Sequence, residues 1–240
     1  MKKLILSCFL MAASLGTWAQ APRVDTVAVI ILNRMADVIG ELNSCSFTLT
    51  TAMDVADPEY GLVKQFRKDD VYLAGPDKML IHSYGDKGHR GFWYNGWQFV
   101  YYSFDENNYA LVDVPPTIIE TIDTINQTYG IEFPAADIFY PTFVDNILNN
   151  FENIVFLGKK QLDDQECFYV MVSNDNMSVQ FWIANDAYNL PRKFIIVYKK
   201  EGNKQYEATF SNWQLNPDIP AAIFEFLPPP AAAKVTLMPR

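Results

Sequence analysis

Apolar residues between Asp25 and Asn43 recur at spacings of three and four, the period of an amphipathic α-helix. They are Val27, Ile30, Ile31, Met35, Val38, Ile39 and Leu42. The polar residues Arg34, Asp37 and Glu41 fall largely on the opposite side of such a helix. The pattern therefore predicts a first helix over residues 25–43.

After this helix the period falls to two, which is typical of β-strands. Phe47, Leu49 and Thr51 alternate with threonines, and β-branched and aromatic residues become frequent. Further strands are predicted over 62–74, which ends at Gly75-Pro76, and over 78–84.

The segment 92–101 predicts a β-hairpin, because Asn95-Gly96 separates two apolar runs and accepts the positive φ angles of a type I′ turn. In a two-residue loop Tyr94 opposes Trp97, and Phe92 opposes Phe99. One face of the hairpin then carries five aromatic side chains: Phe92, Tyr94, Trp97, Phe99 and Tyr101.

Helical spacing returns after Val114-Pro115-Pro116. Thr117 and Glu120 form a capping box, and Gly130 ends the helix that follows. Two further helices are predicted near Ala135 and Thr142. The apolar residues that these helices would turn towards a sheet are Ile118, Ile122, Ile125, Phe139 and Phe143.

A second block of strands follows, with turn-forming separators at the spacing of an antiparallel meander. The predicted strands cover 154–159, 167–173, 178–184, 192–199 and 205–213, with a short last strand over 224–227. No linker divides the two blocks, so we expect an α+β fold in which one wide antiparallel sheet curls and helices cover its concave face. The domain spans 20–230, and we expect 231–240 to be a disordered tail.

The first 19 residues are typical of a secretory signal peptide, with Lys2 and Lys3 before an apolar run and a small-residue cleavage site at Ala19. The apolar run has about a dozen residues, fewer than the 20 or so that cross a bilayer as an anchor. We therefore expect cleavage near Ala19 and a periplasmic or secreted protein without stable membrane insertion.

The chain has 19 Lys and Arg against 28 Asp and Glu, a formal net charge of −9. Loss of residues 1–19 removes two lysines and no acidic residue, which brings the charge to −11. A charge of this sign argues against nucleic acid as a partner.

The sequence offers no catalytic constellation and calls for no cofactor. His82, Asp86 and His89 are close in sequence, but a strand end and a glycine-rich turn would scatter them, so no metal site is expected. Neighbouring carboxylates, as in Asp69-Asp70 and Asp163-Asp164, point to opposite faces of a strand. A secreted hydrolase is the weakest functional alternative.

Two cysteines, Cys45 and Cys167, remain after the signal peptide. An oxidising compartment would permit a disulfide between them. Two free, buried thiols are the alternative, because both residues lie in apolar, strand-like surroundings.

Several segments spread along the chain resemble the DUF2092 family of predicted periplasmic proteins. They are Phe92-Trp93-Tyr94-Asn95-Gly96, Asn108-Tyr109-Ala110, Pro115-Pro116-Thr117-Ile118, Tyr129-Gly130-Ile131-Glu132-Phe133-Pro134, Leu190-Pro191-Arg192-Lys193 and Phe210-Ser211-Asn212-Trp213. Such proteins are similar in expected fold to the periplasmic lipoprotein carriers of the LolA and LppX type. The resemblance implies an incomplete β-barrel plugged by helices around an apolar cavity, and it supplies no catalytic residues.

Two functions follow from this fold. In the first, the aromatic face of the hairpin and the isoleucines and phenylalanines of the helices line a cavity for a lipid or an acylated lipoprotein. In the second, the same residues form a filled core, and the sheet serves as an interaction platform in the cell envelope. The sequence leaves the ligand and the oligomeric state open.

Overall fold

The computed structural model describes residues 23–240, and the predicted signal peptide with its cleavage site near Ala19 lies outside them. The described residues form three α-helices: α1 (Thr26–Gly40), α2 (Ile118–Tyr129) and α3 (Phe143–Asn150). They also form two short 3₁₀ helices, η1 (Ala136–Phe139) and η2 (Ala221–Phe224). The third helix predicted from the sequence, near Ala135, is thus a single 3₁₀ turn.

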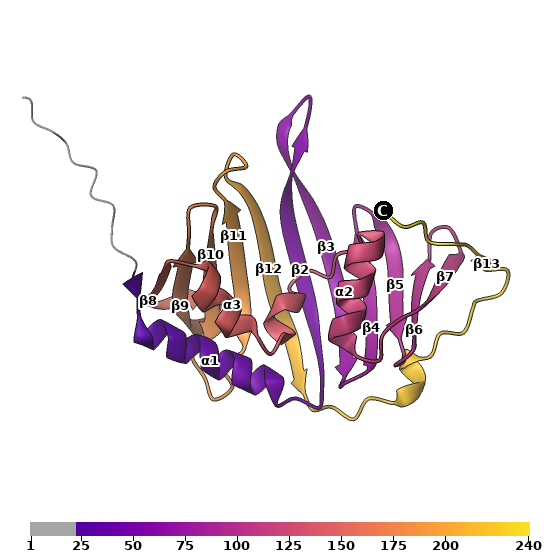
Figure 1. The fold of residues 1–240 in the computed structure, drawn as a ribbon, viewed down its shortest axis with the longest axis horizontal. Helices are drawn as coiled ribbons and strands as arrows, with labels where there is room; N and C mark the ends of the chain where they lie inside the picture. The colour runs from indigo at the N-terminus through magenta and orange to yellow at the C-terminus, as the bar shows by residue number, and fades with distance from the viewer. Residues whose placement is uncertain (1–22) are drawn as a thin grey trace, which may run out of the picture.

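One open sheet of 13 strands organises residues 23–240, in the order β1-β8-β9-β10-β11-β12-β2-β3-β4-β5-β6-β7-β13 (Figure 1). The first seven strands in the chain are β1 (Arg23–Val24), β2 (Ser44–Asp57), β3 (Gly61–Ala74), β4 (Lys78–Gly85), β5 (Gly88–Tyr94), β6 (Gln98–Ser103) and β7 (Asn108–Asp113). The others are β8 (Asn153–Leu162), β9 (Gln165–Ser173), β10 (Met177–Ala184), β11 (Pro191–Tyr198), β12 (Lys204–Leu215) and β13 (Ala233–Lys234). All pairings are antiparallel except those of the two-residue edge strands β1 and β13.

The two blocks of strands join where the last long strand, β12, pairs with the first, β2. Phe210 lies opposite Leu49, and Ala208 lies opposite Thr51. The hydrogen-bonded sheet therefore continues from one block of strands into the other, and the expectation of one wide sheet is confirmed.

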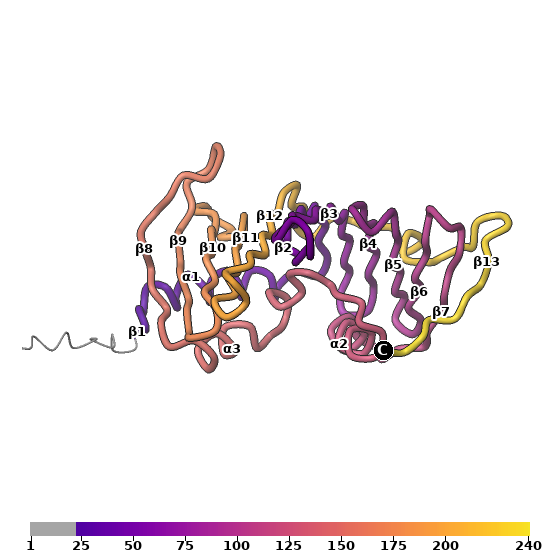
Figure 2. The backbone as a smooth tube through the Cα atoms, turned by 90° about the horizontal axis from the view of Figure 1, so that it is seen from above, coloured from indigo at the N-terminus to yellow at the C-terminus, as the bar shows by residue number. Residues whose placement is uncertain are grey.

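The sheet is curved, and the helices lie in its concavity (Figure 2). Helix α1 packs against β8, α3 and η1, and it buries Leu32 and Met35 completely. The capping box of α2 forms as predicted, since Thr117 Oγ1 accepts a hydrogen bond from the Glu120 amide at 3.3 Å and Gly130 adopts φ +65°. These helices bury the apolar side chains of the concave face.

The segment after β12 corrects the prediction of a last strand over 224–227. Residues 221–224 form η2, and Phe226 packs on the convex face against Trp93 at 5.0 Å and Tyr102 at 5.5 Å between ring centroids. The segment crosses the face of β4–β6, where the backbone groups of those strands are already paired. A strand cannot form there because no free edge is available.

The expectation of a disordered tail over 231–240 is also corrected. Ala233–Lys234 forms β13, which pairs in parallel with β7. Beyond it, the Arg240 amide donates a hydrogen bond to Thr128 O on α2 at 2.9 Å. The C-terminal segment thus passes from the convex face around the β7 edge to the helices (Figure 2).

Candidate functional site

The aromatic hairpin forms, but its register differs from the predicted one. Tyr94 pairs with Phe99 and Phe92 pairs with Tyr101. Gly96 has φ +103°, whereas the φ angle of Asn95 is not positive. The turn therefore has the positive φ of a type II′ turn, at Gly96, and the predicted type I′ turn on Asn95-Gly96 is wrong.

The change of register removes Trp97 from the predicted aromatic face. It becomes the second central residue of the turn, and its side chain is 59% exposed. The Asn95 side chain contributes to the shift, because its Oδ1 accepts a hydrogen bond from the Gln98 amide at 3.2 Å. The other four aromatic residues do share the concave face as predicted.

This part of the concave face is closed by the connection between α2 and η1. Phe133 packs edge-on against Phe92 at 5.7 Å and against Phe99 at 6.1 Å. Phe99 and Tyr94 are fully buried, and the Tyr94 hydroxyl donates to Pro115 O at 2.8 Å. Tyr94 and Phe99 are therefore core residues.

The candidate residues on the helices fall into two groups, one in the core and one at a pocket. Ile125 and Phe143 are buried in the core, and Ile122 packs against the core while remaining half-buried. Ile118 and Phe139, also half-buried, line a pocket that lies towards the N-terminal end of α2. Phe139 stacks on Phe47 of β2 with ring centroids 5.7 Å apart.

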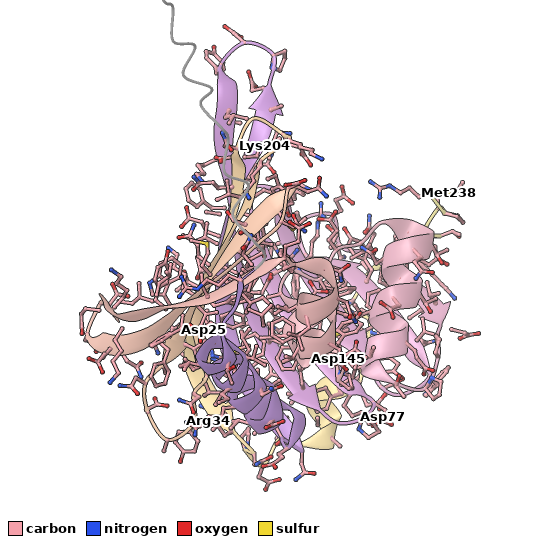
Figure 3. All side chains as sticks on the ribbon, turned by 60° about the vertical axis from the view of Figure 1, so that its left-hand side comes forward. Asp25, Arg34, Asp77, Asp145, Lys204 and Met238 are labelled. Atoms are coloured by element: carbon pink, nitrogen blue, oxygen red, sulfur yellow. The ribbon has the colours of Figure 1, made fainter. Side chains whose placement is uncertain are left out.

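This pocket, which we call the α1–α2 pocket, has a volume of about 800 Å³. Its apolar wall comes from α1, β2, β3, α2, η1 and α3. The principal apolar side chains are Ile39, Leu42, Leu73, Ile118, Ile138, Phe139 and Val144. The charged side chains that line it are all acidic: Asp37, Glu41 and Asp145. Asp145 lies on α3 beside α1 (Figure 3).

A second, smaller pocket lies at the opposite end of α2, beside Gly130, and has a volume of about 280 Å³. Phe92 and Tyr101 from the predicted aromatic face line it. We call it the Arg67 pocket. The Arg67 side chain extends from β3, on the sheet, to the segment that follows α2 on the other side of the pocket. Arg67 Nε contacts Asp69 Oδ1 at 2.7 Å, and Nη1 donates to Glu132 O at 3.4 Å.

Asp69 is only 2% exposed, which is unusual for a carboxylate. Burial raises its pKa above the ordinary value, and the neighbouring Arg67 guanidinium opposes that shift. Asp70 points to the other face of β3, where its Oδ1 accepts a hydrogen bond from Thr48 at 2.9 Å. The predicted opposition of these two carboxylates is confirmed.

The cysteines are both free and buried, so the disulfide alternative is corrected. Cys45 lies on β2 and Cys167 on β9, and strands β10, β11 and β12 lie between them. Adjacent strands are about 4.8 Å apart, whereas bridged Cα atoms lie within about 7 Å. Burial raises the pKa of the Cys45 thiol to about 12 and also raises that of Cys167.

The two histidines pack among aromatic rings. His89 stacks on Phe104 at 3.8 Å and on Tyr84 at 4.1 Å, and His82 meets the edge of Trp93 at 5.5 Å. Within residues 23–240 no three His, Cys, Asp or Glu side chains are grouped so as to hold a metal ion. In that range there is also no helix long and apolar enough to cross a membrane.

Nearly the whole of the described chain matches one known protein family. The family model described as "Predicted periplasmic protein (DUF2092)" matches residues 28–238. The chain belongs to the DUF2092 family. Among curated proteins, none matches it significantly in sequence.

Solved structures resemble this DUF2092 protein in fold. LprF from Mycobacterium bovis matches with a TM-score of 0.52 at 12% identity, over 84% of this chain and 98% of its own. An uncharacterized conserved protein from Thermus thermophilus matches with a TM-score of 0.51 at 11% identity, over 88% of this chain and 99% of its own. The lipoprotein LppX from Mycobacterium tuberculosis has a TM-score of 0.48 at 14% identity, over 82% and 100%. The expected open half-barrel, one curved sheet that does not close and has helices in its concavity, is confirmed as the fold, and LprF shares it.

Sequence reasoning missed the Arg67 pocket of this DUF2092 protein. In the sequence Asp69 draws attention only as the neighbour of Asp70, although Arg67 and Asp69 fall at the same every-second-residue spacing as Val71 and Leu73 along β3. Two charges on the face that carries the core residue Val71 were the available signal. The partners Tyr206 and Glu132 could not have been found, because only the fold brings them to β3.

Proposed function

We propose that this protein binds an apolar ligand, the acyl chain of a lipid or of a lipoprotein, in the α1–α2 pocket. The observation that carries the proposal is the volume of about 800 Å³ between the helices and the sheet, lined by buried and half-buried aliphatic and aromatic side chains. Ligand pockets usually measure about 300–1,000 Å³. Each CH₂ group that enters contributes about 0.8 kcal/mol to binding, so a chain of moderate length suffices for stable binding. The protein would then act by binding, without catalysis.

The charge of the pocket favours certain head groups. Asp37, Glu41 and Asp145 line it, and no lysine or arginine is among the described residues that do. An anionic head group would be repelled there. We therefore expect uncharged or cationic amphiphiles to bind more tightly than anionic amphiphiles of equal chain length.

The setting of this function is the periplasm, which the family description and the signal-peptide pattern both support. We propose that the precursor is cleaved near Ala19. The acyl chain would reach the pocket from a membrane or from an acylated lipoprotein in that compartment.

An interaction protein of the envelope is the second candidate. The hairpin of β2 and β3 projects beyond its neighbours (Figure 1) and exposes three large apolar side chains. Tyr60 is 73% exposed, Leu62 48% and Phe66 58%. Exposed apolar groups of this size are common where a protein partner docks.

A pair of isoleucine-to-tryptophan variants tests the binding proposal. Ile118 lines the α1–α2 pocket, whereas Ile30 lies on the outer side of α1 with 45% exposure. We expect the wild type to bind the uncharged fluorescent probe N-phenyl-1-naphthylamine, and Ile118→Trp to weaken binding at least about tenfold by filling the pocket. Ile30→Trp should bind like the wild type.

Unfolding midpoints on the same samples separate a pocket from a filled core. A pocket accommodates the indole of Ile118→Trp with little change in midpoint, whereas a packed interior loses about 1–3 kcal/mol of stability. A wild type that binds neither the probe nor dodecyl maltoside would rule out the α1–α2 pocket as a binding site.

A further inference from the structure

The concave face changes from apolar to polar towards the Arg67 pocket. Along the pairing direction of the sheet, Asp69 lies opposite Ser83, and Ser83 lies opposite Arg90. Thr51 lies opposite Arg67 in the next row. Polar side chains on the inner face of a closely packed sheet are costly to bury unless they are hydrogen-bonded, so this group calls for a specific explanation.

Two atoms in this group have no hydrogen-bond partner among residues 23–240, although they are buried. They are Nη2 of Arg67 and the hydroxyl oxygen of Tyr206, and both residues line the pocket. The other nitrogens of Arg67 are engaged, Nε by Asp69 and Nη1 by Glu132 O. The free Nη2 can only donate, so it offers a hydrogen bond to an acceptor that the described residues do not supply.

The charges around the pocket also favour an anion. Four cationic side chains line it, those of Arg67, Lys87, Arg90 and Arg240, against three carboxylates: Asp86 and Glu132 in its wall, and Asp69 in contact with Arg67. The protein as a whole carries a net charge of −9. A local excess of cations in an acidic protein concentrates anionic ligands at that position.

We propose that the Arg67 pocket is a second binding site, separate from the α1–α2 pocket, which takes an oxyanion such as a carboxylate or a phosphate. Arg67 Nη2 and the Tyr206 hydroxyl donate hydrogen bonds to its oxygens, and Arg90 and Lys87 supply further positive charge. Charge-assisted hydrogen bonds of this kind are among the strongest in proteins. The volume of about 280 Å³ suits a compact group better than a whole lipid.

Calorimetric titration of the full protein with three compounds tests the proposal and identifies the source of the oxyanion. Inorganic phosphate represents a free anion, decyl phosphate an anionic amphiphile, and decyl maltoside the same chain without an oxyanion. We expect at least one of the two phosphates to bind at least about tenfold more tightly than the maltoside when Ile118→Trp blocks the other pocket. Binding of both phosphates indicates a free anion, and binding of decyl phosphate alone indicates a lipid head group.

Point variants locate the binding. Tyr206→Phe removes only the unpartnered hydroxyl, so it should weaken phosphate binding about three- to tenfold without lowering the unfolding midpoint. Arg90→Gln should weaken it similarly, and increasing salt should reduce the effect of that variant. Tyr198→Phe, on the neighbouring strand outside the pocket, is the matched control and should bind like the wild type.

Two outcomes overturn the proposal. One is that neither phosphate binds more tightly than decyl maltoside. The other is that Tyr206→Phe and Arg90→Gln both bind phosphate as the wild type does, which would place the anion elsewhere.

Discussion

Single residues decide how the hairpin of β5 and β6 closes. Asn95 uses its side chain to hold the Gln98 amide, and Gly96 supplies the positive φ that the turn requires. Asn95 Nδ2 also donates to Glu225 at 2.9 Å, which ties the turn to the C-terminal segment. The two-residue turn thus depends on the positive φ angle of Gly96, which residues other than glycine adopt only with strain.

We expect Gly96→Ala to lower the free energy of unfolding by about 1 kcal/mol or more, because a Cβ at φ +103° strains the backbone. A Cβ at this position would also meet Asp77 Oδ2 at 2.6 Å. Denaturant unfolding measures the change. Gly40→Ala is the control, since no atom lies within 4 Å of its added Cβ, and it should be neutral or slightly stabilising. Equal effects of the two substitutions would contradict this account of the turn.

At the scale of elements, the C-terminal segment covers the outer side of the aromatic hairpin, as α2 and its connection cover the inner side. Phe226 packs against Trp93, Tyr102 and Tyr109, all with ring centroids within 5.5 Å. Strands β4 to β7 are therefore enclosed on both faces. This explains why Val100 and Tyr102 are buried although they point away from the helices.

Removal of the Phe226 ring tests whether the aromatic cluster on the convex face stabilises the protein. We expect Phe226→Ala to destabilise the protein by about 2 kcal/mol, because half-buried aromatic contacts are lost. Leu227→Ala changes the next residue, which is 84% exposed, and should stay within about 0.5 kcal/mol of the wild type. Thermal unfolding of both variants provides the comparison. A stable Phe226→Ala variant would mean that the segment merely rests on the sheet.

At the scale of the whole molecule, two pockets of opposite charge lie on the concave side of the curved sheet, at the two ends of α2. The α1–α2 pocket is large and has acidic groups in its wall, and the Arg67 pocket is small and has mainly basic ones. The packed rings of Phe133, Phe92 and Phe99 lie by the Arg67 pocket, and those of Phe139 and Phe47 by the other. The filled-core alternative therefore describes part of the interior correctly.

The width of the sheet also determines the state of the cysteines. We expect Cys45 and Cys167 to remain thiols in protein isolated from an oxidising compartment, because three strands separate them. Neither should react with a thiol reagent at neutral pH in the native state, since burial raises both pKa values, and both should react after unfolding. Mass spectrometry after alkylation checks this. A mass lower by two hydrogen atoms would contradict the strand order.

Local features of this protein followed from its sequence. The capping box at Thr117, the helical period of α1 and the strand alternation all depend on contacts between residues close in the chain, so pattern alone predicted them. The length of the two strand blocks and the lack of a linker also led correctly to one curved sheet.

What only the tertiary structure decided involves partners far apart in the chain. The turn at Asn95-Gly96 is hydrogen-bonded to Glu225, and the run at 224–227 meets a sheet face without a free edge. Three strands lie between Cys45 and Cys167. The Arg67 pocket assembles Tyr206, Arg90 and Glu132 from separate elements around one guanidinium. Period and propensity describe which face a side chain occupies, but sheet order and curvature determine which side chains share that face, and those depend on packing of the whole chain.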